Sequence, residues 1–560
     1  MMDWVDKYRL WLEKTAENDE LHRELERIAD DNTAIEDRFY RELTFGTGGL
    51  RGVLGAGTNR MNVYTVAKAT QGLANYLKHE FQCPSVAIAY DSRIHSDLFA
   101  RTAAEVFSAN GIMVYIYPHL MPTPSLSFAV RDLGCSGGVV VTASHNPARY
   151  NGYKVYGSDG CQITTEAAKA IQCEIDAVDM FSDVRLTAFS DALDNGTIRY
   201  IGEDTIESYL SAIATASILP KDYSRNLSIV YTPLNGAGIS CVPRCLREHG
   251  FTKIILVEEQ KNPDGNFPTC PFPNPEIREA LELGLKWAKK TDSDLLLATD
   301  PDCDRVGTAV RDGNSYMLIN GNEMGVLLLD FICKMRISSG TMPKCPVAVK
   351  TIVTTPMAAR IANHYGIELR DVLTGFKYIG EQIGFLEKNG EAERYIFGFE
   401  ESYGYLSGSF VRDKDAVNAS LLICEMFAYY KAQGKTLIDV LNDLYQHFGF
   451  YETRLLNFVF EGVSGFKKMQ ELMDSLRKQT PGEIGGIAVQ HVKDYAGGID
   501  GLPQSNVLRF FLEKGMEAVV RPSGTEPKLK VYLTTTGETK ACCAEAAEQL
   551  GGWFQTWAAT

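Results

Sequence analysis

The sequence predicts an α/β protein in which three related α/β domains are followed by a smaller α+β domain. Three times along the chain, an apolar, β-branched run leads into a turn-rich loop and then an amphipathic helix, which is typical of largely parallel α/β layers. From about residue 452, strands follow one another directly and a helix comes last. At roughly 150 residues per domain, 560 residues allow three to five domains. We expect four, at 1–205, 206–320, 321–450 and 451–560.

The first domain should begin with an amphipathic helix. Trp4, Tyr8 and Trp11 fall on one helical face of a segment that is charged throughout, unlike a signal peptide. The elements that follow are expected to be a strand at 85–93, a helix at 97–111, a strand at 112–117 and a strand running into a loop at 137–147.

The second and third domains repeat this order. For the second we expect a strand and loop at 227–238, a helix at 242–250, a strand at 252–259 and a strand ending in a polar loop at 294–305. For the third we expect a strand at 346–355, a helix at 357–366 and a strand and loop at 394–404. The last domain should contain strands at 506–515, 516–524 and 529–536 before its final helix.

The composition indicates a globular protein that acts on small molecules. Lys and Arg total 56 against 71 Asp and Glu, a net charge of −15 that argues against nucleic-acid binding. An acidic protein can still hold an anionic substrate in a locally basic pocket. The longest apolar run, at 325–333, is too short to cross a bilayer.

The cysteines favour a reducing compartment. Thirteen are scattered along the chain without a matched pair of CxxC motifs, which argues against a structural zinc site. We therefore expect a soluble cytoplasmic protein with no nucleic-acid or membrane partner. The sequence does not predict an oligomeric state.

The first candidate site is TASHNP, which contains Ser144 and His145 at the end of an apolar strand. A lone serine there is more often a turn or a helix cap. A serine hydrolase is disfavoured, because no GxSxG motif surrounds Ser144. A serine hydroxyl is a poor nucleophile without polar partners, and His145, Pro147 and Lys154 give this serine more support than a turn requires.

The second candidate is DPDCDR, in which Asp300, Asp302 and Asp304 alternate before Arg305. Carboxylates at this spacing on an extended loop point to one side and can converge on a hard cation. An EF-hand is excluded, because its required Gly and Glu positions hold Arg305 and Arg311. Since about three protein oxygens leave room for a phosphate oxygen, the loop predicts Mg2+.

Three further loops suit phosphate and sugar. FGTGGLRG combines glycines with Arg51 but is not a Walker A motif. GFEESYG offers Glu400 and Ser402 to sugar hydroxyls, although alone it would be read as a surface salt-bridge loop. RPSGTEPK has the chemistry of a phosphate cradle, through Arg521, Ser523, Gly524 and Thr525.

These five loops, in this order, resemble the α-D-phosphohexomutase superfamily of phosphoglucomutases, phosphomannomutases and their relatives. TASHNP looks like the phosphoserine loop, DPDCDR the metal loop, FEES the sugar loop and RPSGTEP the phosphate loop. The chain is most similar to the larger phosphoglucomutase branch that also includes phosphopentomutases. The resemblance implies four domains around a central cleft.

The resemblance also implies roles for single residues. Ser144 would be the phosphorylated serine and, through its phosphate, a metal ligand beside the three aspartates. Arg51, His145 and Arg305 would steady the transferring phosphoryl group, and Lys154 would be the general acid or base. The expected substrate contacts are Lys350, Lys377, Glu400, Ser402, Arg521, Ser523, Gly524 and Thr525.

The implied reaction passes a phosphoryl group between Ser144 and a sugar phosphate, with glucose 1,6-bisphosphate as intermediate and activator. Glucose phosphate is the first expectation, with pentose and mannose phosphates as alternatives, because Phe399 replaces a glycine that many hexose mutases carry before Glu400. A remote alternative is a metal-dependent sugar phosphatase. It is disfavoured because the nine histidines form no ligand-spaced cluster.

Overall fold

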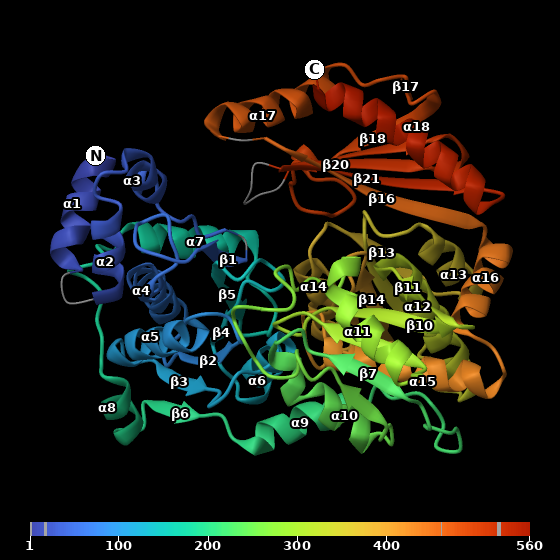
Figure 1. Cartoon of the computed structure of the whole chain (residues 1–560), viewed down its shortest axis with the longest axis horizontal. Coiled ribbons are helices and arrows are strands. Elements are labelled where there is room, and N and C mark those ends of the chain that lie inside the picture. Colours follow the sequence, from blue (N-terminus) through green and yellow to red (C-terminus); the bar gives the residue numbers. More distant parts are fainter. Residues whose placement is uncertain (1–2, 16–18, 47, 461, 523–527, 560) are drawn as a thin grey trace.

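Four β-sheets, each with its own helices, follow one another along the chain (Figure 1). The computed structural model describes residues 3–15, 19–46, 48–460, 462–522 and 528–559. The helices before the first sheet are α1 (Trp4–Lys14), α2 (Asp19–Arg27) and α3 (Asn32–Phe39). Three α/β units and a smaller fourth unit confirm the predicted fold class, while the domain bounds stay a prediction.

The first sheet has the strand order β1-β5-β4-β2-β3-β6. Its strands are β1 (Gly49–Val53), β2 (Ser85–Tyr90), β3 (Met113–Ile116), β4 (Gly137–Val141), β5 (Tyr150–Gly157) and β6 (Ile198–Tyr200). The helices of this unit are α4 (Val63–Glu80), α5 (Ser96–Ala109), α6 (Thr123–Asp132), α7 (Thr165–Asp176), α8 (Phe189–Asp194) and α9 (Glu203–Ala214). β4 is buried along its whole length, as expected of an apolar central strand.

The second sheet has the order β11-β10-β9-β7-β8. Its strands are β7 (Ile229–Thr232), β8 (Ile254–Leu256), β9 (Leu295–Thr299), β10 (Val306–Asp312) and β11 (Ser315–Ile319). The helices of this unit are η1 (Ala237–Ser240), α10 (Val242–Glu248) and α11 (Arg278–Lys290).

The third sheet has the order β13-β12-β14-β15. Its strands are β12 (Val347–Thr351), β13 (Glu368–Val372), β14 (Tyr395–Glu400) and β15 (Gly404–Leu406). The helices of this unit are α12 (Gly321–Ser338), α13 (Met357–Tyr365), α14 (Phe376–Lys388), η2 (Ala392–Arg394), α15 (Ala416–Ala432) and α16 (Leu437–Phe448).

These three sheets share one arrangement of four strands. The orders β5-β4-β2-β3, β10-β9-β7-β8 and β15-β14-β12-β13 coincide when read in the same direction. In each, the first pair is antiparallel and the next two pairs are parallel. The sheets are therefore mixed, and the antiparallel strands β5, β10 and β15 are the members that the sequence pattern did not predict.

The shared arrangement places three loops at equivalent positions. The loop from a central strand to its antiparallel neighbour spans 142–149 in the first sheet, 300–305 in the second and 401–403 in the third. Each loop follows the carboxyl end of a strand that is parallel to the next one in its sheet, where ligands of α/β sheets bind. The predicted serine, aspartate and sugar loops are thus the same structural feature three times.

The fourth unit is built differently and has its own core. Its sheet, ordered β16-β21-β20-β19-β18-β17, is antiparallel throughout. The strands are β16 (Phe450–Val459), β17 (Glu483–Ile484), β18 (Ile487–Asp494), β19 (Leu508–Leu512), β20 (Glu517–Pro522) and β21 (Lys528–Gly537). The helices are α17 (Gly462–Lys478), η3 (Tyr495–Gly497), η4 (Glu513–Gly515) and α18 (Lys540–Ala559).

Apolar packing joins the first three units more closely than it joins the fourth. The largest buried cluster runs through the first three sheets, and α15 contributes many of its residues. A separate cluster fills the space between the fourth sheet and its helices. A small cluster, which includes Ile352, Leu373 and Tyr532, links the third unit to the fourth, and Phe450 and Tyr451 of β16 pack against the largest cluster. Figure 1 shows the fourth unit on one edge of the molecule, beside the third.

Candidate active site

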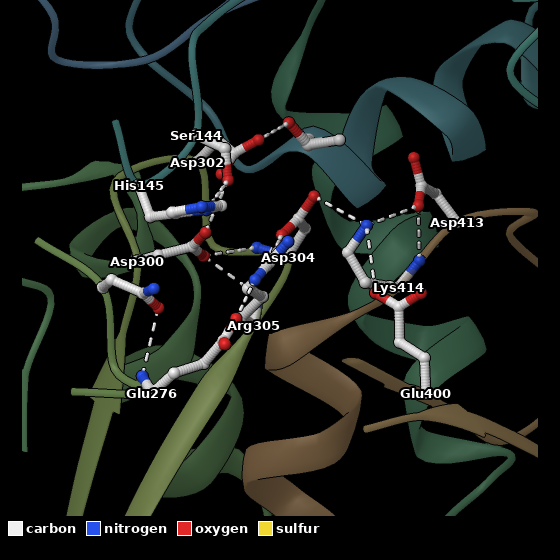
Figure 2. A network of polar contacts seen from close by, with 12 residues as sticks. Ser144, His145, Glu276, Asp300, Asp302, Asp304, Arg305, Glu400, Asp413 and Lys414 are labelled. Carbon is white, nitrogen blue, oxygen red and sulfur yellow. Dashed lines mark hydrogen bonds and ion pairs between the residues drawn. The ribbon is translucent and has the colours of Figure 1, made fainter. Parts of the chain in front are cut away.

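Ser144 lies in the loop at 142–149, and its side chain points at the aspartate loop (Figure 2). Its Oγ donates a hydrogen bond to Asp300 Oδ2 at 2.8 Å and lies 3.2 Å from His145 Nδ1. Ser144 is 3% exposed, and its φ of 51° is in the left-handed region, which is uncommon for a residue with a Cβ. Thr142 supports this turn, because its Oγ accepts a hydrogen bond from Ser144 N at 2.8 Å.

Three carboxylates from the loop at 300–305 converge beside this serine. Asp300, Asp302 and Asp304 are at most 1% exposed, and one oxygen of each lies within 4.8 Å of the others. Asp302 Oδ1 and Asp304 Oδ1 are buried and have no hydrogen-bond partner among the described residues. Such oxygens are unfavourable unless a cation satisfies them, and hard oxygen donors are the ligands that Mg2+ prefers. The donor set therefore fits Mg2+.

The carboxylates do not share one electrostatic environment. Burial and the neighbouring Asp302 and Asp304 raise the pKa of Asp300 well above its ordinary range. Burial acts on Asp304 in the same direction, but the ammonium groups of Lys414 and Lys154 outweigh it and hold the pKa of Asp304 below its ordinary range. Positive charge is therefore concentrated beside Asp302 and Asp304.

Two buried lysines supply this charge. Lys154 Nζ, on β5, lies 2.7 Å from Asp302 Oδ2 and 3.3 Å from Asp304 Oδ2. Lys414 Nζ lies 3.1 Å from Asp304 Oδ2 and 4.0 Å from Glu400 Oε1 (Figure 2). Burial disfavours a charged Lys154, yet the two aspartates outweigh burial and raise the pKa of its amine. Lys154 is therefore protonated at neutral pH.

Two arginines, Arg305 and Arg51, act on His145 through their charges. Arg305 is half-buried and forms an ion pair with Glu276. Burial and then the charges of Arg305 and Arg51 lower the pKa of His145 well below its ordinary value, so its ring is neutral. Arg51, on β1, is exposed and donates from Nη1 to Asn146 Oδ1 at 3.3 Å.

The sugar loop brings one of its two glutamates toward the aspartates. Glu400 is 4% exposed, and burial raises the pKa of its carboxyl. Ser402 is half-buried and hydrogen-bonds to Glu400. Glu401 is held by the loop after β12, since its Oε2 accepts hydrogen bonds from Thr351 Oγ1 at 3.2 Å and Thr354 Oγ1 at 3.3 Å.

The two other expected lysines differ in their surroundings. Lys350 is buried; its Nζ lies 3.0 Å from Asp371 Oδ1 and donates to the carbonyls of Thr351 and Thr354 at 3.2 Å. Lys377 is half-buried at the start of α14, and burial lowers the pKa of its amine. The Lys350 amine is thus bound by one carboxylate and two backbone carbonyls of the protein.

The phosphate loop of the fourth unit is described only at its edges. Arg521 is half-buried on β20 and hydrogen-bonds to Tyr532 on β21. Ser523, Gly524 and Thr525, expected to bind phosphate, lie outside the described residues.

Several residues that contact the site were not identified from the sequence, and three of them bind its charged groups. Thr123 donates from Oγ1 to Asp302 Oδ2 at 3.0 Å, Glu276 pairs with Arg305, and Lys414 pairs with Asp304. For Lys414 a signal was present, because RDKDA places charges directly before a long apolar helix. Thr123 and Glu276 stand in segments with no such signal.

No helix within the described ranges is long and apolar enough to cross a membrane.

Four family models match the chain, all described as phosphoglucomutase/phosphomannomutase. They are domain I at 42–181, domain II at 207–313, domain III at 320–448 and the C-terminal domain at 467–549. The chain is 37% identical over 546 residues to the phosphoglucomutase of Staphylococcus aureus (strain MRSA252), covering 95% of each chain.

Solved structures share the fold at lower identity. A putative phosphomannomutase from Thermus thermophilus is 22% identical, with a TM-score of 0.69 over 92% of this chain and 99% of the other. An Aspergillus fumigatus N-acetylphosphoglucosamine mutase, solved with GlcNAc-6P and magnesium, is 15% identical, with a TM-score of 0.52 over 93% and 96%. Its S69A variant was solved with glucose 1,6-bisphosphate, at a TM-score of 0.50, 16% identity and coverage of 91% and 95%.

Proposed function

The chain belongs to the phosphoglucomutase/phosphomannomutase family of isomerase-type phosphotransferases, and we propose that it interconverts glucose 1-phosphate and glucose 6-phosphate. The observation that carries the proposal is the 2.8 Å hydrogen bond from Ser144 Oγ to Asp300, within a buried group of three aspartates and two lysines. The name of the Staphylococcus aureus relative supports glucose as the sugar.

Ser144 is the proposed carrier of the phosphoryl group. Transfer from phosphoserine to a sugar hydroxyl breaks the Oγ–P bond, forms an O–P bond to the sugar and returns one proton to Ser144 Oγ. The product, glucose 1,6-bisphosphate, then gives its other phosphoryl group back to Ser144. Lys154 is protonated and buried beside the carboxylates, so it is the candidate for carrying the proton.

Mg2+ is the proposed metal. Asp300, Asp302 and Asp304 would hold it, together with the phosphate on Ser144. When bound, it would supply positive charge beside the transferring phosphoryl group. His145, Arg51 and Arg305 are the proposed residues that orient that group, and catalysis of phosphoryl transfer rests largely on such positioning.

The remaining contacts are proposed for the sugar and its second phosphate. Glu400 would accept hydrogen bonds from sugar hydroxyls, and Ser402 Oγ would donate a hydrogen bond to one. Lys350, Lys377, Arg521, Ser523, Gly524 and Thr525 stay proposed substrate residues. Thirteen unpaired cysteines support the cytoplasm as the place where the enzyme meets its sugar phosphates.

A coupled assay tests the proposal. Glucose 1-phosphate, mannose 1-phosphate and ribose 1-phosphate are each supplied with and without glucose 1,6-bisphosphate, and phosphate release is followed in parallel. We expect glucose 1-phosphate to give the highest kcat/KM and Ser144→Ala to be inactive even with the bisphosphate. Ser158→Ala, an exposed serine beyond β5, is the matched control. Near-normal turnover by Ser144→Ala, or phosphate release in place of isomerisation, would refute the proposal.

A further inference from the structure

Arg93 lies behind the serine loop and holds it by its backbone. Its side chain is 0% exposed. The guanidinium donates from Nε to Ser144 O at 3.1 Å and from Nη2 to the same oxygen at 2.5 Å. It also donates from Nη1 to Pro147 O at 3.0 Å and to Tyr150 O at 2.9 Å, and from Nη2 to Asn146 O. One side chain therefore binds four carbonyls between Ser144 and Tyr150.

The loop is tied at its beginning as well, through Asp91. Asp91 Oδ2 accepts a hydrogen bond from Thr142 Oγ1 at 2.6 Å, and Thr142 Oγ1 accepts from Ser144 N. Asp91 Oδ1 accepts from Ser96 Oγ at 2.8 Å and from Arg93 N at 2.9 Å. Asp91 thus fixes both the residue that supports Ser144 N and the residue that binds Ser144 O.

These contacts surround Ser144, whose backbone conformation needs support from its neighbours. A residue with a Cβ is strained at a φ of 51°, and such a conformation persists only where its surroundings enforce it. The amide of Ser144 is bound by Thr142 and its carbonyl by Arg93. Because the direction of the Cα–Cβ bond follows from the backbone, the same contacts set the side from which Oγ reaches Asp300.

A segment of the second unit covers the other side of Arg93. The Phe267 ring, 1% exposed, lies 5.1 Å from the Arg93 guanidinium carbon. Gly265 lies so close to the Arg93 segment that a Cβ on it would come within 2.4 Å of Ile94 N. Asn235 anchors this segment by accepting from Asp264 N at 3.0 Å and donating to Asn262 O at 2.8 Å. The segment also carries Glu276, the partner of Arg305.

We infer that Arg93 is a positioning residue for phosphoryl transfer and that Phe267 keeps its guanidinium in place. Arg93 holds Ser144 in the left-handed conformation, so that Oγ and the group it carries face the three aspartates. The segment 260–277 therefore acts on the serine through Phe267 and holds Arg305 through Glu276. The inference rests on the proposed function of Ser144.

Two variants test it, with a control on the same segment. Phe267→Leu removes the aromatic face but keeps an apolar side chain of similar bulk, and Arg93→Lys keeps the charge but cannot reach all the carbonyls. Phe272→Leu, at a position 58% exposed, is the matched control. The readouts are kcat and KM for glucose 1-phosphate, the thermal midpoint, and the rate at which the phosphorylated enzyme loses phosphate to water.

A misplaced nucleophile slows transfer by up to about 100-fold. For Arg93→Lys we therefore expect a fall in kcat of about that size, with KM changed less than about twofold. Phe267→Leu should show a smaller fall in kcat with the thermal midpoint close to that of Phe272→Leu. In both variants a larger share of phosphoserine should be lost to water, because the phosphate no longer faces the sugar site.

The outcomes separate this inference from the proposed function. A normal kcat and a normal phosphoserine lifetime in folded Phe267→Leu and Arg93→Lys would overturn the inference, as would a lowered thermal midpoint with kcat unchanged, the result of a purely structural role. Activity in Ser144→Ala would instead refute the proposed function. If Arg93→Lys does not fold, Phe267→Leu decides the matter alone.

Discussion

Lys154 Nζ lies 2.7 Å from Asp302 Oδ2, although 148 residues separate the two in the chain. The lysine comes from β5 of the first sheet and the aspartate from the loop after β9 of the second. The proposed proton carrier is therefore paired with a proposed metal ligand. The Lys154 ammonium and a bound divalent cation would therefore compete for the carboxylate of Asp302.

Replacing Lys154 should affect metal binding and turnover in opposite directions. Two unit charges about 4 Å apart repel by about 4 kcal/mol at an effective dielectric constant of 20, so Lys154→Met should bind Mg2+ at least about tenfold more tightly. Transfer should nevertheless slow strongly, because the proton carrier is lost. Calorimetric titration with Mg2+ and the coupled assay measure the two effects.

The control for this prediction is Lys431→Met, because Lys431 of the third unit pairs with Asp294 of the second at 2.6 Å, at the surface of the protein. Neither its Mg2+ affinity nor its turnover should change. Weaker Mg2+ binding by Lys154→Met would show that the lysine helps to hold the aspartates in place for the metal.

Asp300→Asn should stabilise the metal-free protein while removing its response to Mg2+. The pKa of Asp300 is raised by burial and by two neighbouring carboxylates, so an uncharged side chain relieves repulsion there. An asparagine oxygen can still accept the hydrogen bonds of Asp304 N and Arg305 N. We expect a metal-free thermal midpoint about 2–4 °C higher, no further rise on adding Mg2+, and no isomerisation.

Differential scanning calorimetry with Mg2+ and with chelator checks this. The exposed Asp292→Asn serves as control and should keep the Mg2+ response of the wild type. A Mg2+-dependent rise in the midpoint of Asp300→Asn would contradict the assignment of Asp300 as a ligand.

Local patterns in the sequence were sufficient to identify the loops but not their partners. Ser144 and the three aspartates follow apolar strands directly, and the carboxyl ends of such strands are where α/β sheets bind ligands. The alternating spacing of the aspartates alone predicts that their oxygens converge. Both inferences depend on contacts between near neighbours in the chain.

Contacts over long sequence separations could not be predicted in this way. Arg93 binds the carbonyl of Ser144 from 51 residues away, and Lys154 meets Asp304 from 150 residues away. Nothing in the sequence near Arg93 distinguishes it from an arginine in a surface turn. The antiparallel strand β5, which carries Lys154, contains glycines, and its pairing with β1 on one side and β4 on the other makes it a strand.

Asp371→Asn should weaken the contact between the third and fourth units. Asp371 lies 3.0 Å from Lys350 Nζ in the third unit and 3.1 Å from Arg509 Nη1 in the fourth. Without its charge, two cations face one another in a largely buried place, which is unfavourable. Because the fourth unit carries Arg521, KM for glucose 1-phosphate should rise several-fold, with a smaller change in kcat.

Steady-state kinetics test this prediction against Glu517→Gln. Glu517 also pairs with Arg509, at 2.8 Å, but within the fourth sheet. That variant should lower the thermal midpoint of the fourth unit and change KM less. An equal rise of KM in the two variants would show that Arg509 itself, rather than the contact between units, is what matters.

Asp415 should make the stability of the protein fall as the pH rises from about 4 to 6. This side chain is fully buried at the start of α15, where its carboxylate accepts hydrogen bonds from Tyr209 OH at 2.9 Å and from the backbone of Val417 and Asn418 at 2.9 Å. Burial nevertheless outweighs these contacts and raises its pKa from 3.8 to about 6. The folded protein therefore holds this proton more tightly than the unfolded chain does.

The sign of the effect follows from that difference. At a pH between the pKa of Asp415 in the unfolded chain and its pKa in the folded protein, Asp415 is protonated only in the folded protein. Its contribution to the free energy of unfolding is therefore fully present at low pH and is lost as the pH rises through the pKa of the folded protein. At 1.36 kcal/mol per pKa unit, the decline amounts to about 3 kcal/mol. Asp415→Asn keeps the cap and the acceptor for Tyr209 without a titrating proton, so it should gain stability relative to the wild type between pH 4.5 and pH 7.

Thermal midpoints of the wild type and Asp415→Asn across this range measure the effect, because all other titrating groups cancel in the difference. The exposed Asp439 is the control: hydrogen bonds from Thr436 lower its pKa, so its stabilising contribution is present above the unfolded pKa and is lost as the pH falls through the folded pKa. The difference between wild type and Asp439→Asn should therefore be nearly constant between pH 4.5 and pH 7. A difference for Asp415→Asn that is equally constant would mean that Asp415 stays ionised in the folded protein, stabilised by its hydrogen-bond donors against the effect of burial.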